Sequence, residues 1–94
     1  IAVCYAAQQL GVRPQVFMRH GVPALRVHLI RALGGAPVFY GADALAAELH
    51  ARATAEATGQ VFISPYNDAE VIAGQGTLGV ELAEQLAEID AVFV

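Results

Sequence analysis

Hydrophobic positions along the chain fall into segments of two alternating kinds. The longer segments carry apolar residues at helical spacing and predict helices over residues 2–10, 24–33, 44–57 and roughly 69–88. The shorter ones are runs of β-branched and aromatic residues, which predict strands over Gln15–Arg19, Pro37–Tyr40, Val61–Ser64 and Ala91–Val94. The predicted order is therefore helix then strand, repeated along the whole chain.

The predicted strands are apolar without alternation, which is typical of parallel strands covered on both faces. Helices and strands that alternate in this way predict a three-layer α/β/α, Rossmann-like fold with a short parallel sheet of about four strands. In open sheets of this class, ligands bind beyond the carboxyl ends of the strands. Here those ends lie near His20, Tyr40 and the turn at 65–67.

Leucine and isoleucine spacing predicts the inner helix faces at Leu25, Leu29, Ile30 and Leu33 in the second helix and at Leu45 and Leu49 in the third. Asp43 is predicted to cap the third helix, and Asp68 to serve as a turn residue or a helix cap. Glu48 and Arg52 stand at i,i+4, in the favourable orientation for an ion pair. Cys4 lies in an apolar helix, so we expect it to be buried.

Composition narrows the class of protein. Hydrophobic residues make up 56% of the 94, which excludes a disordered chain. The net charge of −4 and the five scattered arginines show no basic face, so no nucleic-acid partner is expected. A single cysteine excludes an internal disulfide and cysteine-based zinc sites. No apolar run reaches membrane-spanning length and no signal core is present, so we expect a cytoplasmic protein without a membrane partner.

The chain contains no lysine, because all five of its Lys and Arg residues are arginine. Chemistry that needs a lysine nucleophile or base is therefore excluded for these residues alone. His20, at the carboxyl end of a predicted strand, is either an acid–base candidate or an exposed loop residue. His28 and His50 lie 22 residues apart with no third ligand in the pattern, so no metal site is predicted.

The segment Gly74–Gly79 reads GQGTLG and matches the dinucleotide fingerprint in its letters only. In that fingerprint the first glycine ends a strand, and an acidic residue ends the next strand. Here the preceding predicted strand ends near Ser64, ten residues earlier, and Asp90 precedes a strand instead of ending one. We interpret the glycines as small residues near a helix start that allow a neighbouring backbone to come close.

One longer stretch carries a family resemblance. The residues ISPYND at 63–68, followed by VIAGQGTLGVEL at 71–82, resemble the threonine/serine dehydratases and serine racemases. These are pyridoxal-phosphate enzymes of the tryptophan-synthase β fold type. The pieces AAQQLGV at 6–12 and RALGGAPV at 31–38 agree in order and spacing, so the resemblance covers essentially all 94 residues.

The resemblance implies a single α/β domain or fragment from the middle of such a catalytic domain. Residues 1–64, approximately, would correspond to the small domain of fold type II, and residues 65–94 to the return toward the large domain. The family's catalytic lysine and glycine-rich phosphate loop would lie outside this stretch. The chain would then hold no catalytic residue, would be incomplete for catalysis by itself, and would not bind the cofactor covalently.

The resemblance also implies a cofactor, a substrate and site residues. The cofactor is pyridoxal 5′-phosphate, and the substrate is a hydroxy amino acid. Apart from the resemblance, we expect a homo-oligomer, because a terminal strand with an unpaired edge favours association. Pro65 and Tyr66 would line the cofactor cleft. Structural positions near the site would be Gly74, Gln75, Gly76 and Thr77, with Gln75 and Thr77 fixing the helix start.

Three functions stay open at this point. The first is dehydration of threonine or serine to a 2-oxoacid and ammonia. The second is racemisation of serine or hydroxyaspartate, which begins with the same proton abstraction. The third is a non-catalytic, stand-alone α/β binding module. Arg19-His20-Gly21 departs from the family's usual proline-and-acid turn, and Arg26 stands where the family often has lysine, so substrate choice is also open.

Overall fold

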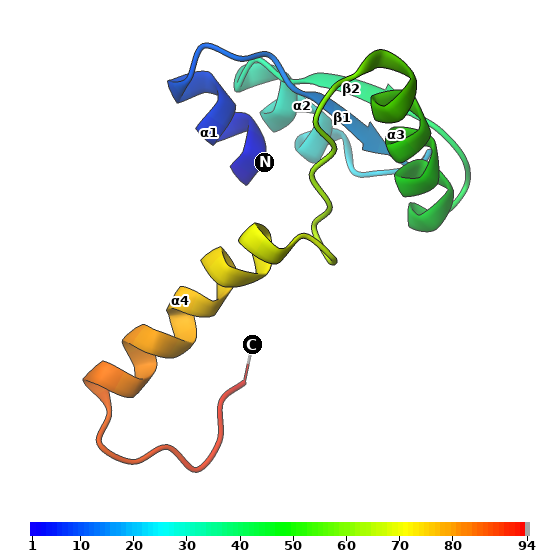
Figure 1. The fold of residues 1–94 in the computed structure, drawn as a ribbon. Coiled ribbons are helices and arrows are strands. Elements are labelled where there is room, and N and C mark those ends of the chain that lie inside the picture. Colours follow the sequence, from blue (N-terminus) through cyan, green and yellow to red (C-terminus); the bar gives the residue numbers. More distant parts are fainter. Residues whose placement is uncertain (94) are drawn as a thin grey trace. The chain divides into compact units, whose positions relative to one another are not determined.

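The computed structural model describes residues 1–93 and divides the chain into two compact units, Ile1–Phe62 and a second that begins at Ile63. The first unit contains α1 (Ala2–Gln9), β1 (Gln15–Met18), α2 (Ala24–Ala32), β2 (Ala36–Phe39) and α3 (Ala44–Thr58). The second unit contains α4 (Ala69–Gln85) (Figure 1). Every predicted helix is therefore present, within about three residues of its predicted bounds.

The sheet of the first unit consists of β1 and β2, paired in parallel from Gln15 opposite Ala36 to Met18 opposite Phe39. Backbone hydrogen bonds extend this pairing at both ends. The amide of Ala36 donates to the carbonyl of Pro14 at 2.8 Å, and the amide of Tyr40 donates to the carbonyl of Met18 at 2.9 Å. The strand ends are therefore fixed relative to each other.

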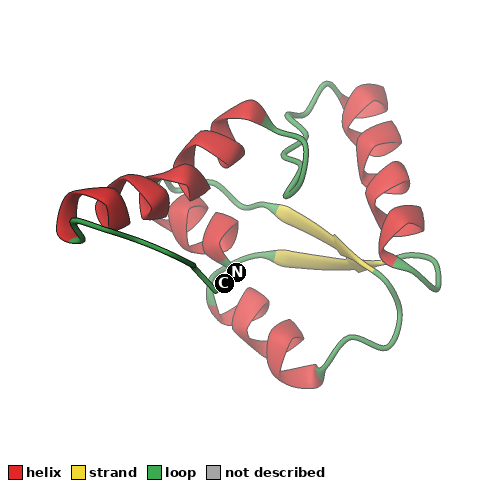
Figure 2. Ribbon diagram, turned by 90° about the horizontal axis from the view of Figure 1, so that it is seen from below, coloured by secondary structure: helices red, strands yellow, loops and turns green. Residues whose placement is uncertain are grey.

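The first unit has three layers. Successive strand residues point to opposite faces of a sheet, so Met18 and Phe17 mark the two faces of β1. Met18 is buried in one cluster with Cys4 of α1 and Ile30 of α2, whereas the ring of Phe17 contacts His50 of α3. Figure 2 shows helices of this unit on either side of the paired strands. The α/β class and the layered arrangement follow the sequence prediction.

The predicted number of strands is wrong for the described residues. Their sheet has two strands instead of about four. Residues 61–64 and 91–93 form no strand, and the last residue of the predicted fourth strand, Val94, lies outside the described residues. A strand exists only when a neighbouring strand accepts and donates its backbone hydrogen bonds, and apolar composition alone does not supply that partner.

The inner faces of two helices also differ from the prediction. In α3 the buried residues are Ala47, Ala51 and Ala55, while Leu45 and Leu49 are 64% and 56% exposed. In α2 the buried residue is Ile30, as predicted, but Leu25 and Leu29 lie at the surface. The leucines and the alanines of α3 both recur at helical spacing. The alanines face the sheet because their small side chains allow the helix to approach β1 closely.

The helix ends follow the sequence closely. The Asp43 carboxylate accepts the amide of Ala46 at 2.8 Å and caps α3, which ends at Gly59 with a left-handed φ of 68°. In the second unit the Asp68 carboxylate accepts the amides of Glu70 and Val71 and caps α4. Glu48 and Arg52 form the predicted ion pair at 3.8 Å, and the Arg52 guanidinium also lies 4.8 Å from the centre of the Phe62 ring.

Across residues 1–93, no helix combines the length and the apolar character needed to cross a membrane. Cys4 is fully buried, as predicted from its apolar surroundings.

Candidate functional site

Aromatic and imidazole rings gather at the carboxyl edge of the sheet in the first unit. The ring of His50 in α3 stacks on Tyr40, which follows β2, with centroids 3.8 Å apart and planes 14° from parallel. The same imidazole meets the ring of Phe17 edge-on at 5.6 Å. This is the edge at which open α/β sheets bind ligands.

The turn after β2 brings these rings together. Gly41 has a φ of 69°, and a Cβ atom at this position would lie 2.7 Å from the Cβ of Ala46. The chain therefore passes so close to the first turn of α3 that only glycine fits. The tight turn places Tyr40 beside α3, where His50 lies about two turns further along the helix.

His20 lies on the neighbouring strand end. Its amide donates to the carbonyl of Gly41 at 3.0 Å, and its ring stacks on Phe39 at 6.0 Å. The Arg19 guanidinium donates to the His20 carbonyl at 3.0 Å. The His20 side chain is exposed, which agrees with a loop histidine. Among the described residues, no group of three or more His, Cys, Asp or Glu could hold a metal ion.

In the second unit, the segment with Pro65 and Tyr66 is ordered by a buried serine. The Ser64 side chain is 4% exposed, and its Oγ accepts the amides of Tyr66 at 3.3 Å and Asn67 at 3.2 Å. This turn leaves the Tyr66 ring 67% exposed. The segment therefore presents an accessible aromatic ring on a backbone held by side-chain hydrogen bonds.

The segment Gly74-Gln75-Gly76-Thr77 lies in the interior of α4 and not at its start, which is at Ala69. The prediction that Gln75 and Thr77 fix the helix start is therefore wrong; Asp68 has that role. The Thr77 hydroxyl donates to the Gly74 carbonyl at 2.8 Å, inside the same helix. A Cβ atom at Gly74 or Gly76 would meet no atom within 4 Å, so the predicted close approach of a neighbouring backbone is absent from the described residues.

Sequence reasoning did not find the His50–Tyr40 stack. The two residues lie ten positions apart, on either side of a turn, and no periodicity links them. The only signal was the glycine that follows Tyr40, since a strand, a glycine and a capped helix in succession predict a tight strand-to-helix turn.

The three layers define an α/β protein, and its ring cluster lies at the carboxyl ends of the strands, the edge at which open α/β sheets bind ligands. The chain belongs to the family of pyridoxal-phosphate dependent enzymes, which matches residues 1–94. It is 39% identical over 92 residues to threonine dehydratase 2 (biosynthetic, chloroplastic) of Solanum lycopersicum, covering 98% of this chain and 16% of that protein. It is 37% identical over 93 residues to a serine racemase of Arabidopsis thaliana, covering 99% of this chain and 28% of that protein.

Among solved structures, that of maize serine racemase superposes with a TM-score of 0.80 at 35% identity. The superposition covers 95% of this chain and 27% of the maize chain. The 94 residues thus span less than a third of the length of these relatives.

The residues present can be compared with what the family's cofactor requires. Enzymes of this kind hold pyridoxal phosphate through a lysine, and the chain contains none. The 94 residues therefore do not fit as the covalent attachment site, and we assign no reaction step to them.

Proposed function

We propose that the protein is a pyridoxal-phosphate dependent threonine or serine dehydratase, which converts a hydroxy amino acid to a 2-oxoacid and ammonia. The observation that carries this proposal is the similarity of nearly the whole chain to threonine dehydratases, at 39% identity in one case and 36% in another. The bound cofactor supplies an electron sink for the substrate's α-carbon, and the protein supplies binding and orientation.

In this reaction, the 94 residues would help to orient the cofactor and the substrate. In the first unit, the ends of two paired strands lie beside α3, and there the ring of Tyr40 stacks on that of His50. In the second unit, Ser64 holds the Pro65–Tyr66 segment. We propose that Pro65 and Tyr66 form a wall of the cofactor cleft and that the first unit corresponds to the family's small domain.

The direct test is an assay of the full-length protein with L-threonine, L-serine and D-serine, with detection of both 2-oxoacid and inverted amino acid. A 2-oxoacid from L-threonine or L-serine is the expected result. If neither a 2-oxoacid nor an inverted amino acid forms, catalysis on these substrates is refuted.

Racemisation of serine or hydroxyaspartate is the second candidate. It is favoured by the identity of 37% to the Arabidopsis serine racemase and by the superposition on the maize serine racemase. The same assay, with hydroxyaspartate as a further substrate, separates the two candidates, because a racemase yields the opposite enantiomer of its substrate and a dehydratase yields a 2-oxoacid.

A third candidate, from a different class, is a non-catalytic α/β binding module with this ancestry. It is supported by the absence of lysine from the 94 residues. Mixing the full-length protein with pyridoxal phosphate tests it, because a lysine-bound cofactor absorbs at about 410–420 nm. A non-catalytic binding module is expected to give no such band. A lysine-bound band in the full-length protein would refute this candidate.

A further inference from the structure

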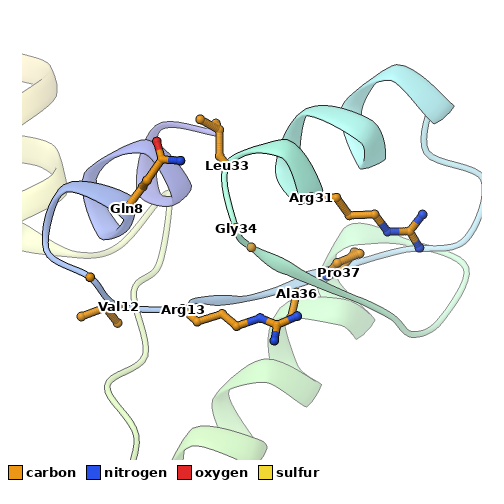
Figure 3. Close-up of a pocket in the computed structure, with 10 residues that line it drawn as sticks. Gln8, Val12, Arg13, Arg31, Leu33, Gly34, Ala36 and Pro37 are labelled. Carbon is orange, nitrogen blue, oxygen red and sulfur yellow. The ribbon is translucent and has the colours of Figure 1, made fainter.

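The first unit has an open hollow of about 720 Å³ at the edge of the sheet opposite the ring cluster (Figure 3). Its lining comes from the end of α1, the segment before β1, the end of α2 and the start of β2. The amino ends of both strands therefore border it, while Tyr40 and His50 lie beyond their carboxyl ends. The hollow is distinct from the edge at which a ligand is expected in this class of fold.

Two arginines, Arg13 and Arg31, are among the residues that line this hollow, and both are exposed. Figure 3 shows that they come from different elements, Arg13 from the segment that leads into β1 and Arg31 from the last turn of α2. Within residues 1–93 neither side chain has an ion pair or a hydrogen bond. The dipole of α2 stabilises the positive charge of Arg31, which lies in its last turn. Arg13 lies on no helix, so no helix dipole stabilises its charge.

The charge distribution of the chain makes this local excess of positive charge unusual. All nine acidic residues lie at Asp43 or beyond, whereas residues 1–42 contain four of the five arginines. Every residue that lines the hollow belongs to this acid-free stretch. No carboxylate of the lining therefore neutralises the two cations, although the chain as a whole has a net charge of −4.

The other lining residues offer few free hydrogen-bond donors to a ligand. The backbone amides of Gly34, Gly35 and Ala36 already donate to the carbonyls of Arg31, Ile30 and Pro14. Among the lining side chains, the two guanidiniums and the side-chain amide of Gln8 can donate to a ligand. Guanidinium groups form paired, charge-assisted hydrogen bonds with phosphate oxygens, and two such groups match the two negative charges of a phosphate.

We propose that this hollow binds a phosphate group, either free phosphate or that of a small phosphomonoester, through Arg13 and Arg31. Its volume lies in the range of small-molecule sites, and Val12, Leu33 and Pro37 provide an apolar wall for the rest of an ester. The proposal rests on residues of the first unit alone and not on the proposed function.

Calorimetric titration of the protein tests this site, with any bound cofactor retained and unbound cofactor removed. The probes are inorganic phosphate and glycerol 3-phosphate at constant ionic strength. We expect a dissociation constant on the order of 1 mM for phosphate, at the weak end of protein–ligand affinities. Tighter binding of the ester would identify a phosphomonoester as the ligand, and equal binding would identify free phosphate. Absence of binding by both would overturn the proposal, whatever reaction the protein catalyses.

Matched variants show whether the two arginines form the site. Arg13→Gln and Arg31→Gln are each expected to weaken phosphate binding about tenfold, because each removes charge-assisted hydrogen bonds. Arg26→Gln is the control, since Arg26 is an exposed arginine of α2 outside the hollow. It should change the affinity less than about twofold, as expected for a screened, distant charge. An equal loss in all three variants would show diffuse attraction and refute a defined site. Far-UV circular dichroism checks that each variant is folded.

Discussion

At the scale of single residues, Gly35 is the position where the fold leaves least room. A Cβ atom there would lie 2.8 Å from the Cys4 Sγ, 2.9 Å from the Ile30 Cγ2 and 3.1 Å from the Ile30 carbonyl oxygen. Cys4 and Ile30 are the most buried side chains described, so neither can move aside. The residue that follows the turn after α2 must therefore be glycine for reasons of packing.

We expect Gly35→Ala to lower the free energy of unfolding by about 1–3 kcal/mol, the usual cost of an extra methyl group in a packed core. Urea denaturation followed by circular dichroism measures this change.

Gly74→Ala is the matched control, because it adds the same methyl group inside α4, where nothing lies within 4 Å. Alanine favours a helix, so this variant should gain about 0.5–1 kcal/mol. A neutral Gly35→Ala variant would show that the contacts around Cys4 relax easily and would refute the packing argument.

Tyr66 is the single residue on which the proposed cofactor wall can be tested. Its ring is exposed and its backbone is held by Ser64. If the ring packs on the cofactor, Tyr66→Ala should raise the dissociation constant for pyridoxal phosphate about three- to tenfold, the range of aromatic contacts. Tyr66→Phe keeps the ring and should change it little. Fluorescence titration of the full-length apo-protein measures both.

Tyr5→Ala controls for the loss of an exposed tyrosine elsewhere, since Tyr5 is 60% exposed in α1. Unchanged cofactor affinity in Tyr66→Ala would remove Tyr66 from the cofactor cleft.

At the scale of elements, the sequence predicted where helices begin and end better than which face they bury. The caps Asp43 and Asp68 and the stop at Gly59 are local signals, because a side chain or a positive φ acts within one turn. The buried face of α3 is a long-range property. Leu45 and Leu49 have the same spacing as Ala47 and Ala51, and the contact with β1 decided between them.

The cap of α4 gives a prediction at this scale. Asp68→Ala removes the acceptor for the amides of Glu70 and Val71, so it should destabilise the second unit by about 1 kcal/mol. The loss of helicity should be visible by circular dichroism, and amide hydrogen exchange in the first turn of α4 should accelerate.

Asp90→Ala removes the same charge at an exposed position outside any helix and should leave both measurements unchanged. An equal effect of the two substitutions would mean that net charge, and not the cap, stabilises α4.

At the scale of the whole molecule, apolar surface is the dominant feature. The exposed large hydrophobic side chains include Leu10, Leu25, Leu45, Leu49, Val61, Ile72 and Phe93. In the described residues the sheet has two strands, so each strand has one edge whose backbone groups have no strand partner. Unpaired edges and large apolar patches favour association.

We therefore expect the 94-residue chain to form dimers or larger species when it is produced alone, as measured by sedimentation velocity. Leu49→Lys should weaken this association, because it replaces an exposed leucine of α3 by a charge.

Ala53→Lys adds the same charge to an exposed position of α3 and removes almost no apolar area. If it weakens association equally, the effect is electrostatic. A monomer at the highest accessible concentration would contradict the expectation altogether.

The sequence by itself determined the alternation of helices and strands, the helix caps and the family, because these depend on neighbours within a few positions or on a contiguous motif. Only the tertiary structure decided that β1 pairs with β2 while 61–64 stays unpaired, and that alanines of α3 face the sheet. It also decided that Arg13 and Arg31, 18 residues apart, line one hollow. These outcomes depend on contacts between segments that are distant in the sequence. The spacing of residues within one segment does not determine the free energy of such contacts.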